Sequence, residues 1–228
     1  MVICKNGLTP LIWSIFVAAD LMETTTTLLS PTPMSPKKTL ITFDIDGTLC
    51  RSDATKTLVP NALHTQAFSH AFKEVYGIDA NIDEIPHQGS TDQLILLKVL
   101  MNRGYNKEEV TAKLPDLVKS MIEFATSNKD KAGDGLQLLD GVKEALTALR
   151  ARDDVIFGLV TGNLEPIAWI KMEALGIRHC FSDPCFGGFG SDHCSGQVDA
   201  SHLDRAEFIR IARARAMARH GLRESDIA

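Results

Sequence analysis

The chain has 228 residues, of which 44% are hydrophobic and 23% are charged, values that are ordinary for a soluble globular protein. This length is sufficient for one large domain or for a core with a smaller second domain. The formal net charge of −5 argues against nucleic acid or a membrane surface as a partner, and no run of about 20 apolar residues predicts a membrane span. The five cysteines include no C-x-x-C pair, which indicates free thiols in a reducing compartment, and we therefore expect a cytoplasmic protein.

The N-terminal part of the chain differs in composition from the rest. A short apolar run at residues 11–19 ends in Val-Ala-Ala, which leaves an N-terminal targeting segment as a weaker alternative. The Thr-, Ser- and Pro-rich tract at residues 24–36 is typical of a disordered linker. Because Met34 stands just before the first predicted strand, we predict that residues 1–37 are a disordered or dispensable extension.

The segment LITFDIDGTL, residues 40–49, combines an apolar, β-favouring run with two carboxylates spaced two residues apart. Residues two apart on a strand point to the same side, so Asp44 and Asp46 are expected together at the end of a buried strand. Two such acids repel each other unless a cation lies between them. Gly47 then allows a turn whose backbone N–H groups bind anions, and Thr48 adds a hydroxyl group. The pattern predicts a divalent metal beside a phosphate site, as phosphoryl transfer requires.

A helical region follows this acidic segment. Apolar spacing predicts helices over residues 60–76, 93–101, 107–114 and 117–127. Ser90 with Gln93 forms a capping-box pattern at the start of the second of these helices. We therefore expect an all-α insertion over residues 54–133, and Gly133-Asp134-Gly135 is predicted to be a hinge at its end.

The second half of the chain alternates helices with strands. We predict helices over residues 142–152, 166–175 and 204–220, a strand over 155–160, a short strand within 181–186 and a loop over 187–192. The strand at 155–160 is continuously apolar, as expected of a parallel strand buried on both faces. The alternation predicts an α/β protein with a parallel, Rossmann-like three-layer core over residues 38–53 and 134–228. Ligands of such sheets bind beyond the carboxyl ends of the strands, where both the acid pair and Thr161 fall.

The sequence Asp44-Ile-Asp46-Gly-Thr-Leu resembles the first signature of the haloacid dehalogenase superfamily, and in particular of its phosphatase and phosphomutase branches. The resemblance implies that Asp44 is a nucleophile that becomes an aspartyl-phosphate, that Asp46 is the general acid and base, and that both hold Mg²⁺. The segment Thr161-Gly162-Asn163 resembles the second signature, whose hydroxyl and backbone N–H groups bind the transferred phosphoryl oxygens; Thr48 joins them. The helical insertion resembles the cap of one subclass, and the whole is most similar to phosphoglycolate phosphatase relatives.

The third signature of the superfamily is normally a lysine at the start of the helix before the fourth strand. Arg205 matches this position best, although its guanidinium has a different donor geometry. The alternative is that Arg205 is a solvated residue in the first turn of a helix. Lys171 is a rival cation, but it lies in the middle of the helix predicted after the second signature.

The fourth signature, a strand ending in Gly-Asp whose acids complete the Mg²⁺ shell, has no match in this sequence. The last predicted helix ends near Gly221, and the sequence stops at Ala228. We therefore expect a core that is incomplete at the C-terminus, as in a fragment or a truncated gene model. Loss of one acidic metal ligand and of the neighbour of the first strand would reduce activity and stability.

The resemblance implies Mg²⁺-dependent hydrolysis of a small phosphorylated metabolite, and it leaves the oligomeric state open. A phosphomutase of the β-phosphoglucomutase kind and a truncated inactive relative remain alternatives. Candidate substrate contacts in the cap are His64, Ser90, Thr91 and Asp92, for which helix capping or a helix surface position is the alternative. The His and Cys side chains between residues 179 and 194 leave zinc as a weaker alternative, because their spacing fits no standard zinc site.

Overall fold

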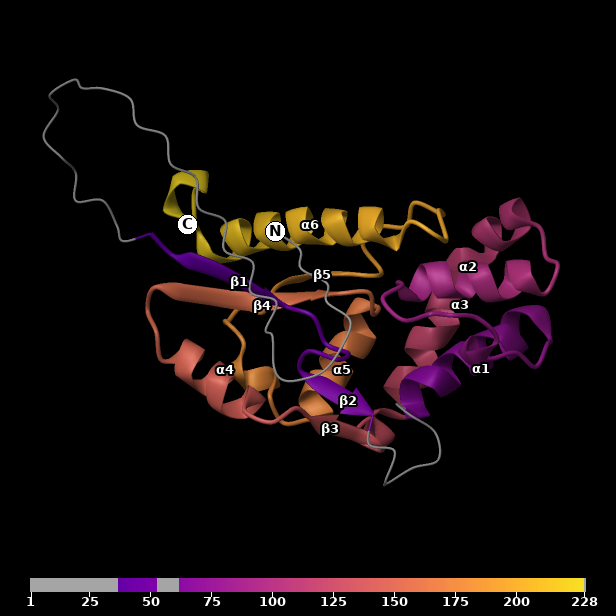
Figure 1. Cartoon of the computed structure of the whole chain (residues 1–228), viewed down its shortest axis with the longest axis horizontal. Helices are drawn as coiled ribbons and strands as arrows, with labels where there is room; N and C mark the ends of the chain where they lie inside the picture. The colour runs from indigo at the N-terminus through magenta and orange to yellow at the C-terminus, as the bar shows by residue number, and fades with distance from the viewer. Residues whose placement is uncertain (1–36, 53–61, 228) are drawn as a thin grey trace, which may run out of the picture.

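The computed structural model of the chain describes residues 37–52 and 62–227. Its central sheet contains three parallel strands in the order β1–β4–β5, with bounds β1 (Thr39–Phe43), β4 (Val155–Thr161) and β5 (Gly187–Phe189). Helix α6 (Ser201–His220) covers one face of the sheet, and α4 (Val142–Arg150) and α5 (Glu165–Ala174) lie on the other face (Figure 1). The predicted α/β class with a parallel, three-layer core is confirmed.

The register of the sheet brings the two signature segments together. Residues Phe43 and Leu159 are partners in the pairing of β1 with β4, so Asp44 and Thr161 emerge at the same edge of the sheet. All seven residues of β4 are buried, which explains why its sequence is continuously apolar. This edge of the sheet, at the carboxyl ends of β1 and β4, is where a ligand is expected in an open parallel sheet.

The third strand of the sheet lies later in the chain than predicted. The prediction of a strand within residues 181–186 is wrong. This segment follows a 3₁₀ turn (Arg178–Cys180), and strand pairing with β4 begins only at Gly187. Residues 187–189 were expected in a loop because glycine has low strand propensity. Glycine is required here, since a Cβ atom at Gly188 would overlap the main-chain carbonyl group of Phe208 on α6. The tight contact of α6 with β5 thus explains the unusual strand sequence.

Three helices form a second packed region beside the sheet (Figure 1). They are α1 (Ala62–Tyr76), α2 (Asp92–Asn102) and α3 (Lys107–Ser127), and a 3₁₀ turn (Ile82–Glu84) lies between α1 and α2. Within residues 62–133, which the structure describes throughout, no strand is present. We call α1, α2, α3 and this 3₁₀ turn the helical region. Its apolar core includes Leu63, Phe68, Phe72, Leu96, Leu100, Leu114, Leu117 and Met121.

Two details of the helical region differ from prediction. The separate helices expected over residues 107–114 and 117–127 form one continuous helix with Pro115 inside it. Proline removes one backbone donor, but Pro115 is exposed, and burial of Leu114 and Leu117 on either side holds the helix together. Helix α2 is capped by Thr91 rather than by Ser90, because the Thr91 hydroxyl accepts the Leu94 N–H at 3.4 Å.

A small antiparallel pair of strands, which the sequence did not predict, lies between the sheet and the helical region (Figure 1). It joins β2 (Cys50–Ser52) to β3 (Leu136–Leu138), at the points where the chain leaves the sheet and returns to it. Strands of three residues are too short to give a readable alternation. The predicted hinge at residues 133–135 directly precedes β3.

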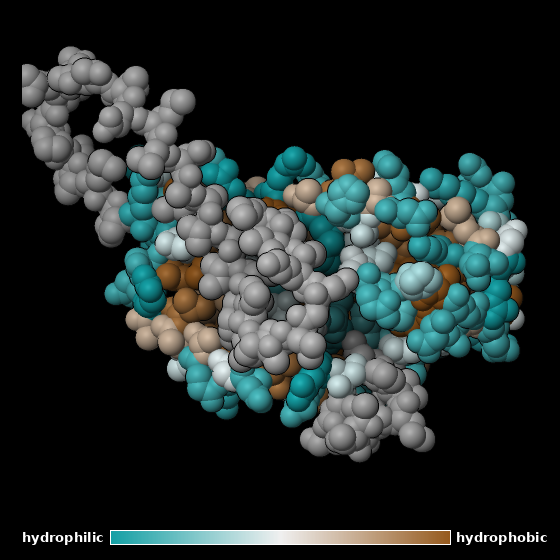
Figure 2. Space-filling model, in the orientation of Figure 1, coloured by the Kyte–Doolittle hydropathy of each residue, from teal (hydrophilic) through white to brown (hydrophobic). Residues whose placement is uncertain are grey.

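Hydrophilic residues cover much of the surface over α6 and over the helical region in Figure 2. In the described part of the chain, the large hydrophobic residues that are clearly exposed are Leu203 and Ile209, both on α6. None of the described helices combines the length and apolar character that crossing a membrane requires. Of the predicted extension at residues 1–37, only Lys37 belongs to the described residues.

Candidate active site

A cavity of about 560 Å³ lies between the carboxyl ends of β1 and β4 and the helical region. Its floor is formed by Asp44, Asp46, Gly47, the segment 161–163 and Arg205. Its opposite wall is formed by residues of α1, of the 3₁₀ turn and of the segment that leads into α2. The structure thus brings together in one cavity most of the residues that the sequence singled out.

Arg205 pairs with Asp44, although 161 residues separate them in the chain. Its guanidinium donates a hydrogen bond of 2.6 Å to Asp44 Oδ2, and Oδ1 of the same carboxylate accepts the Ile45 N–H at 2.9 Å. The side chains of Arg205 and Asp44 are 27% and 32% exposed, so the pair faces the cavity. Charge-assisted bonds of this length are strong, and this one holds Asp44 in a fixed direction.

Lys171, Asn163 and Asp46 form a closed network on the other side of the site. Lys171 Nζ donates to both carboxylate oxygens of Asp46 at 3.0 Å and to Asn163 Oδ1 at 2.7 Å. Asn163 Nδ2 completes the network with a bond of 3.0 Å to Asp46 Oδ2. Removal from water would raise the pKa of Asp46, but the charge of Lys171, assisted by His64 and by these hydrogen bonds, lowers that pKa below its usual value.

Lys171 is the site residue that sequence reasoning undervalued. Its side chain is only 2% exposed, and it lies in the last turn of α5 rather than, as predicted, in the middle of the helix. The signal was present in the pattern, because Lys171 follows Ile167 and Ala168 at helical spacing, on the buried face of α5. A lysine on such a face needs a carboxylate partner. Lys171 and Arg205 therefore serve different acids, and are not rivals for one position.

The turn after β4 contacts the helical region directly. The Asp92 N–H donates to the Gly162 carbonyl at 2.9 Å, and a Cβ atom at Gly162 would lie 2.5 Å from the Ser90 carbonyl oxygen. Within the turn, the Asn163 N–H donates to the Thr161 hydroxyl at 3.3 Å. Glycine at position 162 thus allows the segment before α2 to approach the end of β4.

Asp92 and His64 join the helical region to α5. His64 Nε2 lies 2.9 Å from Asp92 Oδ2, and the same carboxylate oxygen accepts the Leu164 N–H at 2.9 Å. His64 is 7% exposed and Asp92 is 2% exposed, yet both side chains border the cavity. A buried carboxylate with these partners is well satisfied.

Two predicted contacts are not brought into the cavity lining. Thr91 is fully buried and caps α2, which is the helix-capping alternative to a substrate contact. Thr48 lies in the turn after β1, where its N–H donates to the Ile45 carbonyl, and it does not line the cavity. By contrast, Ser90 does line the cavity.

The donor set at the floor of the cavity suits a hard cation. Asp44 would supply a carboxylate oxygen and Asp46 its main-chain carbonyl oxygen, and Mg²⁺ is commonly held by one or two carboxylates together with other oxygen ligands, water and substrate phosphate. Among the described residues, no group of three or more His, Cys, Asp or Glu side chains is placed to hold a metal ion. The two acids therefore fit Mg²⁺ in ligand type, and the zinc alternative at residues 179–194 receives no support.

A match to a family model shows the family to which the chain belongs. A family model for haloacid dehalogenase-like hydrolases matches residues 38–212, and the chain belongs to this family. No curated protein sequence matches the chain significantly. Among solved structures, the chain is similar to a predicted phosphatase from Clostridium acetobutylicum, with 14% identity, 85% of this chain and 74% of that chain covered, and a TM-score of 0.49. It is also similar to a predicted phosphoglycolate phosphatase from Haemophilus somnus, with 20% identity, 85% and 76% covered, and a TM-score of 0.45.

Proposed function

We propose that this hydrolase is a Mg²⁺-dependent phosphatase that cleaves a small phosphate monoester through an aspartyl-phosphate on Asp44. The observation that carries the proposal is the separate pairing of the two acids, Asp44 with Arg205 and Asp46 with Lys171, on the floor of one cavity. The turn at residues 161–163 lines the same cavity beside them, and its hydroxyl and backbone N–H groups would donate to phosphoryl oxygens.

The reaction divides between the two acids. One carboxylate oxygen of Asp44 forms a bond to phosphorus while the bond to the alcohol oxygen breaks. The lowered pKa of Asp46 favours its ionised form in the free site, so Asp46 would first take a proton from the monoanionic phosphate ester. It would give this proton to the departing alkoxide and later take one from the water that cleaves the acyl-phosphate. Bound Mg²⁺ would be held by Asp44 and Asp46 and would offset the negative charge of the phosphate.

The contacts of Asp44 indicate what must change when substrate binds. Arg205 occupies Asp44 Oδ2 at 2.6 Å, so it has to share its guanidinium donors with the phosphate before that oxygen can attack. A guanidinium carries five N–H donors, which makes this sharing feasible without loss of the charge near Asp44. Arg205 then stabilises the charge that develops on the transferred group.

We propose in addition that the helical region acts as a cap and selects the leaving group. The proposed division places the cap at residues 54–133 and the core at 38–53 and 134–228. His64, Ser90 and Asp92 border the cavity from the cap side, which supports this division. Closure of such a region over the substrate excludes bulk water while the leaving group is bound.

The function is tested by hydrolysis of p-nitrophenyl phosphate with Mg²⁺ and with EDTA. We expect turnover that requires Mg²⁺, and an acid quench during turnover should leave phosphate on the peptide that contains Asp44. Turnover without any phosphate on that peptide would overturn the aspartyl-phosphate route. Absence of turnover at every Mg²⁺ concentration would overturn the phosphatase assignment.

Replacement of Lys171 by methionine tests the network around Asp46. Methionine has a similar length but cannot donate to Asp46 or to Asn163 Oδ1, so these oxygens lose their shared donor and we expect the melting temperature to fall. Turnover should fall by about 10–100-fold, because Asp46 loses the group that orients it. The matched control is Lys98→Met, which removes the ammonium that pairs with Asp199 at 2.9 Å, outside the site. Full activity of Lys171→Met would show that the network has no part in the reaction.

A further inference from the structure

The end of the cavity opposite Asp44 is poor in positive charge. Its lining includes Thr65, Phe68, Asp83 and the segment 87–90, all from the helical region or from the segment that leads to α2. Among the described lining residues, Arg205 is the only lysine or arginine, and its guanidinium donates to Asp44 on the floor. Asp83 and Asp92 also line this cavity. The wall that would meet the leaving group thus carries acids and neutral polar groups.

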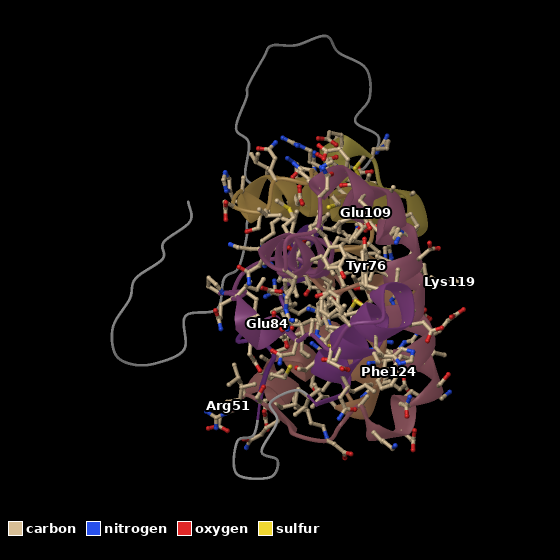
Figure 3. The ribbon with its side chains drawn as sticks, turned by 90° about the vertical axis from the view of Figure 1, so that its right-hand side faces the viewer. Arg51, Tyr76, Glu84, Glu109, Lys119 and Phe124 are labelled. Atoms are coloured by element: carbon tan, nitrogen blue, oxygen red, sulfur yellow. The ribbon has the colours of Figure 1, made fainter. Side chains whose placement is uncertain are left out.

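Cations of the helical region and of β2 lie outside the cavity lining. Arg103 donates hydrogen bonds of 2.6 and 2.7 Å to the two carboxylate oxygens of Glu84, and these bonds are the main reason why the pKa of Glu84 is lowered to about 2. Lys98 pairs with Asp199. Arg51 is exposed and extends away from the ribbon in Figure 3. None of these side chains lines the cavity.

His87 lines the cavity, and its main-chain contacts indicate which ring nitrogen carries the proton. Its Nδ1 atom lies 3.2 Å from the carbonyl oxygens of both Ile82 and Ile85, which requires that Nδ1 carries a proton. In the neutral ring, Nε2 is then a hydrogen-bond acceptor. A hydroxyl group can donate to such an atom, whereas a carboxylate or a second phosphate would oppose it with another acceptor.

These observations point to the kind of alcohol that leaves. We propose that the preferred substrate is the phosphate monoester of a neutral, hydroxyl-bearing alcohol, without a carboxylate or a second phosphate on the leaving group. This inference rests on the proposed phosphatase function and narrows it. A leaving group with a second negative charge would lie near Asp83 with no cation of the described wall to pair with, so discrimination arises from repulsion as well as from missing contacts.

The test compares two esters with the same carbon skeleton. Glycerol 3-phosphate and 3-phosphoglycerate differ only in that a hydroxymethyl group in the first is a carboxylate in the second. We expect kcat/KM to be at least about tenfold higher for glycerol 3-phosphate, a difference typical of one unpaired charge in a binding site. Equal values, or a preference for 3-phosphoglycerate, would overturn the proposal.

A charge-reversal variant provides an independent readout. Asp83→Lys places a cation at the far wall, so the ratio of kcat/KM for glycerol 3-phosphate to that for 3-phosphoglycerate should fall by about tenfold. The matched control is Asp116→Lys, which makes the same change on the exposed surface of α3 and should leave the ratio unchanged. If both variants shift the ratio equally, the far wall does not determine the preference.

Failure of this inference can be told apart from failure of the phosphatase function. Turnover of p-nitrophenyl phosphate with a preference for 3-phosphoglycerate would retain the function and overturn the inference. If no ester is hydrolysed, the function fails, and calorimetric titration of the same two esters decides the inference. Tighter binding of glycerol 3-phosphate would support it. Equal binding, tighter binding of 3-phosphoglycerate or no binding of either would overturn it.

Discussion

Replacement of Asp44 by asparagine should reduce turnover by at least about 10³-fold, because an amide cannot serve as the nucleophile that forms the acyl-phosphate. The variant should fold normally. Asparagine has nearly the same shape, and the lost pair with Arg205 is partly exposed, so the cost in unfolding free energy should be about 1 kcal/mol or less. Initial rates with p-nitrophenyl phosphate and a thermal melt measure the two effects separately.

The control for this variant is Asp116→Asn, which makes the same change on an exposed position of α3. It should keep full turnover. An acid quench should trap no phosphate on the Asp44→Asn chain. Turnover of Asp44→Asn within tenfold of the unmodified chain would show that another group attacks phosphorus.

Replacement of Asp46 by asparagine should reduce turnover by an amount that depends on the leaving group of the substrate. With an alkyl phosphate, loss of the proton donor should reduce turnover by about 10²–10⁴-fold. With p-nitrophenyl phosphate the reduction should be much smaller for the first step, because p-nitrophenolate leaves without a proton. Single-turnover rates with both substrates measure this difference. Equal reductions with both esters would contradict the assignment of Asp46 as the general acid.

The same variant should also be less stable. Lys171 is 2% exposed, so its charge would be left without a carboxylate, which typically costs about 3–5 kcal/mol in a fully buried pair. Because the Asp46 side chain is itself 46% exposed, we expect a smaller loss of about 1–3 kcal/mol in unfolding free energy. A second change, Lys171→Met, should restore stability without restoring turnover. Denaturant unfolding of the single and double variants tests this coupling.

The elements with strong local patterns could be predicted from the sequence. The apolar spacing of α1 and the continuous apolar run of β4 identified both elements to within a few residues. The strand β5 could not be recognised, because Gly188 is required by its contact with Phe208 on α6, which is distant in the chain. The pair β2 and β3 was missed for a related reason, since short strands are stabilised by partners that local propensity does not reveal.

The sequence predicted which residues form the candidate site more fully than it predicted the contacts between them. Asp44, Asp46 and the turn at residues 161–163 do meet at one edge of the sheet, because parallel strands place their carboxyl ends together. The resemblance implied a cation at Arg205 beside Asp44, whereas the partner of Asp46 could not be predicted, since it depends on which face of α5 reaches the edge. Lys171 was therefore undervalued, although its position among buried residues was visible in the sequence. The roles assigned to these residues stay predictions.

The two hydrogen bonds that Asp92 forms with the segment after β4 affect the order of steps in the reaction cycle. Its N–H holds the Gly162 carbonyl and its carboxylate holds the Leu164 N–H, so the start of α2 and the turn that would grip the phosphate share one set of bonds. If the helical region moved away from the sheet, both bonds would break and a carboxylate that is now 2% exposed would become hydrated. Release of product and loosening of the turn that would bind the phosphate would then occur together. Both hydrogen bonds would have to form again when the next substrate enters.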